Sequence, residues 1–255
     1  MSPDELQTGQ RLVGEAARVT VLTGAGISTD SGIPDFRGPN GLWTKNPKAE
    51  RTSNIDYYVS DPEVRRLAWQ GRINWMTEPR SPNDGHRALV QLDRRGTLDT
   101  LVTQNIDGLH QAAGSDPARV VEIHGTIHEV VCLACEARTP MNDTLERVRA
   151  GEEDPSCLVC RGMLKSATIS FGQNLVPADL DRAMEAAQAC DLLLAVGSTL
   201  SVYPVAAMVP LAKRQGAAIV IVNAERTELD DLADVVLRGS ISEILPAVLG
   251  EPSGS

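Results

Sequence analysis

Aromatic residues, positive charge and cysteine are all scarce in this sequence. Phe, Trp and Tyr make up only 3% of its 255 residues, whereas hydrophobic residues as a whole make up 42%. We therefore expect a sizeable core built mainly from Val, Leu, Ile and Ala. The chain carries 24 Lys and Arg against 34 Asp and Glu, which gives a formal net charge of −10. This balance argues against direct binding of nucleic acid, because such binding needs a basic face that displaces counterions.

No apolar run is long enough to cross a membrane, which needs about 18 or more consecutive apolar residues. Residues 1–10 are polar, and they lack the basic-then-apolar order of a signal peptide. A cytoplasmic enzyme is the expectation. The length suits one large α/β domain with a smaller inserted unit.

The five cysteines do not form a disulfide framework, because four of them fall into two closely spaced pairs. Cys132 and Cys135 form one Cys-x-x-Cys pair, and Cys157 and Cys160 form the other. Two such pairs about twenty residues apart are typical of a structural zinc ribbon with four thiolate ligands. A dithiol redox pair is the less favoured alternative. Cys190 stands alone in an apolar run and is expected to be a buried core thiol.

Apolar segments alternate with amphipathic ones along most of the chain, which predicts a doubly wound parallel sheet of Rossmann-like α/β type. Strands are expected at 19–23, 98–102, 119–123, 167–172, 190–196, 216–222 and 233–237. The main helices are expected at 7–18, 64–76, 141–151, 177–189, 203–215 and 242–249, with a disordered tail at 250–255. We expect residues 1–40, 82–127 and 166–255 to form the large domain. Residues 41–81 would be a helical insertion and residues 128–165 a zinc-binding insertion.

A polar cluster follows two of the predicted strands. Asn105 and Asp107 come after the apolar run that ends at Val102, and His124 follows the next strand. An amide, a carboxylate and an imidazole at the carboxyl edge of a sheet can bind sugar hydroxyls and move a proton. The alternative is a polar loop in which Asn105 and Asp107 make only local backbone bonds.

A glycine-rich turn, Gly24 to Gly32, follows the first predicted strand. Such a turn lets the backbone approach a pyrophosphate, although its third glycine comes too late for the G-x-G-x-x-G fingerprint. The next loop, rich in Pro and Gly, places Phe36 beside Arg37, which suits a lid over a cofactor. An ordinary strand-to-helix turn and a loop anchored by Phe36 are the alternatives.

Taken together, these motifs resemble the sirtuins, the NAD-dependent protein-lysine deacylases. The resemblance rests on Gly24-Ala25-Gly26-Ile27-Ser28, Ile33-Pro34-Asp35-Phe36-Arg37-Gly38, Thr103-Gln104-Asn105-Ile106-Asp107, His124-Gly125, both cysteine pairs, Gly197-Ser198 and Asn223. It implies a Rossmann-like domain with two insertions, one helical and one zinc-bearing, that form a smaller domain. NAD and an acyl-lysine peptide would meet in the cleft between the two domains. It also implies release of nicotinamide, free lysine and O-acyl-ADP-ribose by an enzyme that we expect to be monomeric.

The resemblance assigns roles to individual residues. His124 would be the general base on a ribose hydroxyl, and Asn105 and Asp107 would act with it at the nicotinamide and the ribose. The full set implied for NAD binding is Gly24, Ala25, Gly26, Ser28, Asp35, Phe36, Arg37, Trp43, Gln104, Asn105, Ile106, Asp107, Gly197, Ser198, Thr199, Asn223, Ala224, Glu225 and Ile241. The peptide would add as a strand between residues near Phe171-Gly172 and residues near Ser201-Val202.

Two departures from the family bear on the substrate. Gln173 follows Phe171-Gly172 where many sirtuins have Glu, which bears on peptide preference. Sirtuins that remove succinyl or malonyl groups carry Tyr-x-x-Arg in the helical insertion, whereas Trp69 precedes Arg72 here. Neutral acyl groups are therefore expected. The alternatives are ADP-ribosyl transfer to protein and removal of longer, lipoyl-like groups in the same pocket.

Overall fold

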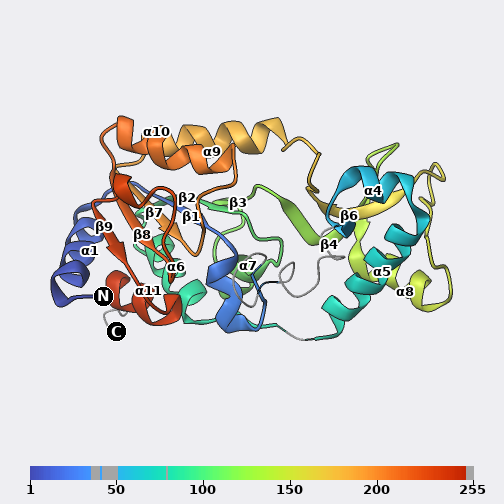
Figure 1. Ribbon diagram of the computed structural model, residues 1–255, viewed down its shortest axis with the longest axis horizontal. Helices are drawn as coiled ribbons and strands as arrows, with labels where there is room; N and C mark the ends of the chain where they lie inside the picture. The colour runs from blue at the N-terminus through green and yellow to red at the C-terminus, as the bar shows by residue number, and fades with distance from the viewer. Residues whose placement is uncertain (36–40, 42–50, 79, 251–255) are drawn as a thin grey trace.

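Two sheets of different construction organise the chain (Figure 1). The computed structural model describes residues 1–35, 41, 51–78 and 80–250. The larger sheet has six strands, all parallel, in the order β3-β2-β1-β7-β8-β9. They are β1 Val19–Thr23, β2 Leu98–Thr103, β3 Val120–Glu122, β7 Leu192–Val196, β8 Ala218–Val222 and β9 Val235–Leu237. This is the doubly wound sheet that the sequence predicts.

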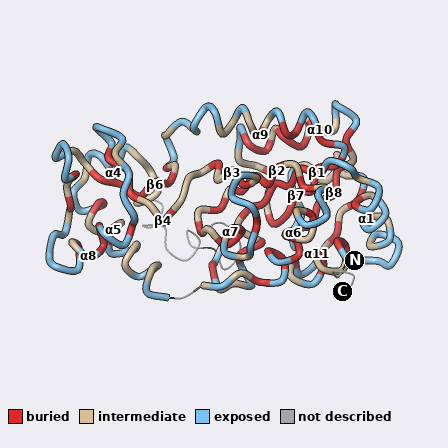
Figure 2. Tube along the Cα trace, turned by 180° about the vertical axis from the view of Figure 1, so that it is seen from behind, coloured by how far each residue is buried: buried red, intermediate tan, exposed pale blue. Residues whose placement is uncertain are grey.

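Helices cover both faces of the larger sheet, because its central strands are apolar on both sides. One face packs against α1 Pro3–Glu15, α6 Asp84–Arg94 and α11 Ile241–Leu249. The opposite face packs against α9 Pro177–Ala189 and α10 Met208–Arg214 (Figure 1). Every residue of β1 and of β7 is buried, and Figure 2 shows how strongly burial is concentrated in these strands.

The order of the strands reverses between β1 and β7. From β1 the chain continues outward through β2 and β3, and it later returns to the other side of β1 as β7, followed by β8 and β9. In a doubly wound sheet such a reversal opens a crevice at the carboxyl ends of the two strands, and ligands bind there. The loops that enter this crevice begin with Gly24 and Gly197.

The smaller sheet is antiparallel and has three strands in the order β5-β4-β6. Its strands are β4 Gly125–Cys132, β5 Arg138–Pro140 and β6 Leu164–Thr168, and the helices beside it are α4 Ile55–Ser60, α5 Pro62–Thr77 and α8 Met141–Arg149 (Figure 1). Trp69 of α5 is buried in one cluster with Cys132 and Leu145. The helical and cysteine-bearing insertions therefore share a single small core.

The structure corrects three predicted elements. The single helix predicted at 203–215 is the short 3-10 helix Val205–Ala207 followed by α10 Met208–Arg214. The strand predicted at 167–172 lies instead at 164–168, where it pairs with β4 of the smaller sheet. Its start was placed too late because the polar residues Lys165 and Ser166 do not look like part of a buried strand. The first helix runs over 3–15, not 7–18, because the Ser2 side chain caps its first turn.

Short helical segments complete the described chain: the 3-10 helices Ala25–Ser31, Val205–Ala207 and Asp230–Leu232, and α7 Leu109–Ala113. Among the helices of the described residues, none combines the length and the apolar character needed to cross a bilayer. Of the tail predicted to be disordered, residues 251–255 lie outside the described residues.

Candidate active site

The turn after β1 and the loop after β7 approach each other backbone to backbone. The Gly26 N–H donates to the carbonyl of Gly197 at 2.8 Å. A Cβ on Gly26 would lie 2.7 Å from the Cα of Gly197, and a Cβ on Gly197 would lie 2.5 Å from the nitrogen of Ile27. Gly197 also has a φ of 64°. Only glycine fits at both positions, so the floor of the crevice is bare backbone that a ligand can approach closely.

Asn105, Ser28 and Asp107 form one buried network above this floor. The Asn105 amide nitrogen donates to the carbonyl of Gly24 and to Ser28 Oγ, at 3.1 Å each. Ser28 Oγ donates to Asp107 Oδ2 at 2.7 Å, and Asp107 Oδ1 accepts from the Leu109 N–H at 2.9 Å. Only the last bond is local. The network therefore joins the turns after β1 and β2 and holds an amide and a carboxylate at the crevice.

His124 lies where β3 gives way to β4. Its Nδ1 is 3.0 Å from the carbonyl of Gln104. Because a carbonyl only accepts, Nδ1 carries the proton in this contact and Nε2 keeps its lone pair. Burial lowers the pKa of His124, an effect that the hydrogen bond to Gln104 partly offsets. The imidazole is therefore neutral at pH 7, as a general base must be.

Two buried histidines support the network from within the larger unit. His86 Nε2 lies 3.4 Å from Ser28 Oγ, and His110 Nε2 lies 2.9 Å from Thr23 Oγ1. Burial lowers the pKa of His86 to about 4 and that of His110 to about 3, so both stay neutral. His86 also closes a capping box with Asn83 at the start of α6. Its contact with Ser28 could not be seen in the sequence, because the two residues are far apart in the chain.

The loop after β8 forms the far end of the crevice. The Asn223 amide nitrogen donates to the carbonyl of Glu225 at 2.8 Å. Arg238 donates to the carbonyls of both residues and pairs with Asp230. The shape of this loop is therefore fixed by a charged side chain from β9's exit, which the sequence analysis did not identify.

A single cleft of about 1800 Å³ brings the predicted site residues together. Its walls include Gly24, Ala25, Gly26, Ser28, Asp35, Gln104, Asn105, Ile106, Asp107, His124, Gly197, Ser198, Thr199, Asn223, Ala224, Glu225 and Ile241. Three predicted residues, Phe36, Arg37 and Trp43, lie outside the described residues. The walls also include Arg72, which the comparison with Tyr-x-x-Arg had singled out, and Tyr58 and Lys165 of the smaller unit, which the sequence did not point to.

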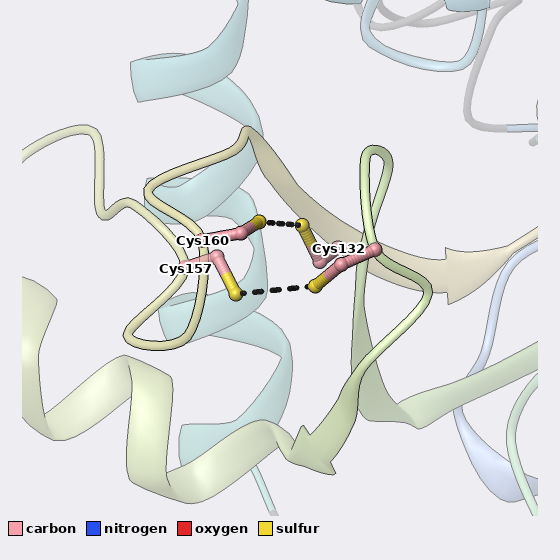
Figure 3. A group of neighbouring side chains, drawn as sticks. Cys132, Cys157 and Cys160 are labelled. Atoms are coloured by element: carbon pink, nitrogen blue, oxygen red, sulfur yellow. Dashed lines mark hydrogen bonds between the residues drawn. The ribbon is translucent and has the colours of Figure 1, made fainter.

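The two cysteine pairs converge on one point between α8 and the smaller sheet (Figure 3). All four sulfur atoms lie within 4.8 Å of one another, with Cys132 Sγ 3.5 Å from Cys160 Sγ and Cys135 Sγ 3.7 Å from Cys157 Sγ. Tetrahedral zinc with Zn–S bonds of about 2.3 Å separates its sulfur ligands by about 3.8 Å. The cluster thus fits zinc, and four sulfur ligands leave no position for a reactive water.

Residues 24–204 match the family model described as the Sir2 family. The chain belongs to the Sir2 family. A relative from Streptomyces coelicolor, NAD-dependent protein deacetylase 2, is 49% identical over 231 residues, which cover 91% of this chain and 96% of the relative. NAD-dependent protein deacetylase 1 from Bradyrhizobium diazoefficiens is 43% identical over 242 residues, covering 94% of this chain and 93% of the relative.

Solved Sir2 structures share the whole architecture. One structure of a Sir2 enzyme matches with a TM-score of 0.87 and 37% identity, covering 97% of each chain. A Sir2 complex with p53 peptide and NAD+ matches with a TM-score of 0.84 and 33% identity, covering 98% of each chain. The sequence-based resemblance is therefore confirmed at the level of family and fold.

The segment after β6 has the form of a tight turn in this Sir2 family member. The Gln173 N–H donates to the carbonyl of Ser170 at 3.0 Å, and the Gln173 side-chain oxygen accepts from the Ser170 N–H at 2.9 Å. The N–H and carbonyl of Phe171 already pair with Ser53 and Ile55. The backbone N–H and carbonyl of Phe171 are therefore already engaged within the chain.

Proposed function

We propose that the chain is an NAD-dependent protein-lysine deacylase. It would transfer the acyl group of an acyl-lysine side chain to ADP-ribose and release nicotinamide and free lysine. One observation carries this proposal: a neutral His124 lines the same cleft as the Asn105–Ser28–Asp107 network, at the reversal point of a parallel sheet. The names of the relatives from Streptomyces and Bradyrhizobium support it.

The overall reaction consumes acyl-lysine, NAD+ and one water, and it yields lysine, nicotinamide and O-acyl-ADP-ribose. NAD+ supplies a ribose carbon from which nicotinamide can leave. The part of His124 is to remove a proton at Nε2 from a ribose hydroxyl whose oxygen then bonds to the acyl carbon. The carbonyl of Gln104 holds Nδ1–H throughout and favours the imidazolium that results.

The remaining cleft residues would bind and orient the two substrates. Asn105 and Asp107, fixed by Ser28, would position the nicotinamide end of NAD. The bare backbone at Gly24, Gly26 and Gly197 would admit the pyrophosphate. The adenosine half would be held at the opposite end, by Ser198, Thr199, Asn223, Ala224, Glu225 and Ile241. The resemblance adds Phe36, Arg37 and Trp43, which lie outside the described residues, to the residues proposed for NAD binding.

The zinc-bearing unit would have a structural role. We assign residues 41–81 and 128–165 to the small domain and residues 1–40, 82–127 and 166–255 to the NAD-binding domain, and strands β4 and β6 of the smaller sheet cross the boundaries at 127–128 and 165–166. The acyl-lysine peptide would lie between them, beside residues that follow Phe171 and beside Ser201-Val202. Thiols at metal-ligand spacing are typical of a reducing compartment, which supports a cytoplasmic location.

Mass spectrometry of the reaction products tests the proposal. The full chain, loaded with zinc, is incubated with NAD and peptides that carry acetyl, propionyl, butyryl, lipoyl or succinyl lysine. We expect deacylated peptide and O-acyl-ADP-ribose to appear in equal amounts. ADP-ribose attached to protein or peptide, with the acyl group retained, would contradict deacylation and establish the transferase alternative.

A further inference from the structure

The turn that carries Asp107 is held in place by two residues of β4. The carbonyl of Asp107 lies 2.8 Å from His128 Nε2, and the carbonyl of Ile106 accepts from the Ile127 N–H at 3.0 Å. Because a carbonyl only accepts, His128 Nε2 carries a proton and is the donor of this hydrogen bond. Two successive residues of β4 therefore fix two successive peptide groups of the turn.

The shape of the turn also depends on His128. Gly108, which follows Asp107, has a φ of 70°. A Cβ on Gly108 would lie 2.8 Å from His128 Nε2 and 3.0 Å from His128 Cδ2. A side chain at this position would strain the backbone and push the imidazole away from the turn. The bare backbone at Gly108 thus gives the imidazole its access to the carbonyl of Asp107.

Asp107 borders two cavities, and this makes its support by hydrogen bonds important. One cavity is the cleft of about 1800 Å³, and the other has a volume of about 420 Å³ and is lined by Gly108, Glu122 and His128 among others. A segment in a close-packed core is fixed by neighbours on every side. Beside a cavity that packing is missing, so the position of the Asp107 peptide group depends more on the bonds that its carbonyl makes.

The peptide group of Asp107 in turn sets the direction of its carboxylate. Oδ2 accepts from Ser28 Oγ at 2.7 Å, and Oδ1 accepts from the Leu109 N–H at 2.9 Å. Both bonds weaken steeply when distance or angle departs from the optimum. Without the bond from His128 the Asp107 peptide group would be free to rotate, and the carboxylate would lose its fixed place in the cleft.

We propose that His128 is a positioning residue for the nicotinamide end of NAD, and that it acts through the carbonyl of Asp107. The inference rests on the proposed function, in which Asp107 positions that end of NAD. The adenosine end would be held by Asn223 and Glu225 after β8, on the other half of the sheet, so its binding should not depend on His128. His128 is exposed, so its replacement opens no cavity in the core.

Two amide side chains of different length test the proposal. His128→Gln places an amide nitrogen the same number of bonds from Cα as Nε2, whereas the amide nitrogen of His128→Asn falls one bond short. The affinities for NAD and for ADP-ribose, which lacks the nicotinamide, are measured by titration without acyl peptide. We expect His128→Asn to weaken NAD binding about three- to tenfold, the loss of one hydrogen bond, and to leave ADP-ribose binding unchanged. His128→Gln should retain both affinities.

Turnover gives a second measurement, and a neighbouring residue gives the control. In His128→Asn, kcat/KM for NAD should fall by a similar factor, whereas KM for the acyl-lysine peptide should stay at the wild-type value. Glu129→Gln is the matched control, because Glu129 is the next residue of β4 and pairs with Arg138 at the surface. Both affinities of this variant should equal those of the wild type.

The outcomes separate this inference from the proposed function. Equal losses of NAD and ADP-ribose affinity in His128→Asn would reveal a merely structural role and overturn the inference. Wild-type NAD affinity in His128→Asn, or an equal loss in His128→Gln, would overturn it too, and the deacylase function would stand. If the wild type binds NAD but deacylates no peptide, the deacylase function falls, and the two affinities still decide the role of His128.

Discussion

The larger and the smaller unit of this chain are stabilised in different ways. In the larger unit β1 and β7 are wholly buried and mostly apolar, and the polar residues of the site begin only after each strand ends. In the smaller unit two cysteines belong to the core, and β6 carries a buried lysine within the strand itself. The hydrophobic effect accounts for the stability of the larger unit, whereas the smaller unit also needs a metal and a set of polar contacts.

Metal removal should give the largest difference between the two units. With a strong chelator, or in Cys157→Ser, we expect the smaller sheet to unfold and deacylation to be lost, because structural zinc is worth on the order of 10 kcal/mol of folding energy. Hydrogen exchange should show loss of protection in β4, β6 and α8 and retention in β7. Cys190→Ser is the control, since Cys190 lies in the core of the larger unit away from the cluster. Unchanged protection in β4 and full activity after chelation would refute the structural role of zinc.

A methyl group at the crevice should have the next largest effect. Gly26→Ala places a Cβ 2.7 Å from the Cα of Gly197, where backbone and not a flexible side chain must move. We expect a loss of about 2–3 kcal/mol in the free energy of unfolding and weaker NAD binding.

Gly14→Ala is the matched control for this change. Gly14 lies in α1, and nothing lies within 4 Å of a Cβ built there. Alanine should raise stability by about 0.5–1 kcal/mol, as expected inside a helix. Equal effects of the two substitutions in urea denaturation would show that the crevice is not closely packed.

The two units should also differ in how their stability depends on pH, and this effect should be smaller than those of metal removal and of Gly26→Ala. Burial, reinforced by the positive charge of Arg72, lowers the pKa of Lys165 from 10.5 to about 7. Between these values the unfolded chain binds more protons, so the smaller unit should gain stability as the pH rises from 7 to 10.5, by at most about 1.4 kcal/mol per pH unit. The lowered pKa values of His86 and His110, about 4 and 3, predict loss of stability in the larger unit as the pH falls below 6.5.

Urea denaturation at several pH values, followed by tryptophan fluorescence for the smaller unit, measures these dependences. Lys165→Met should remove the gain in stability between pH 7 and 10.5. If Lys165→Met leaves this gain unchanged, burial does not lower the pKa of Lys165.

The same contrast explains what could be predicted from the sequence. The parallel strands are apolar runs, so Asn105, Asp107 and His124 could be assigned to one sheet edge before the structure was known. The cysteine spacing likewise predicted the cluster. Helix α5, with its capping Asp61 and apolar spacing, lies close to where it was expected.

Other features could not be predicted, because they depend on contacts between distant segments. Ser28 meets Asp107 across 79 positions, and Arg72 meets Ser166 across 94. The start of β6 was misplaced because Lys165 and Ser166 look like surface residues in the sequence, and their burial follows from pairing with β4. Residue pattern specifies elements well, but it does not reveal which polar side chains the assembled core encloses.

The most direct test of the account is the activity of His124→Ala with NAD and an acyl-lysine peptide. Loss of the general base should reduce formation of O-acyl-ADP-ribose by about 10²–10⁴-fold. NAD affinity, measured by titration, should remain close to that of the wild type, because the Asn105–Ser28–Asp107 network does not include His124. Turnover near the wild-type rate in this variant would contradict the assignment of His124 as the base.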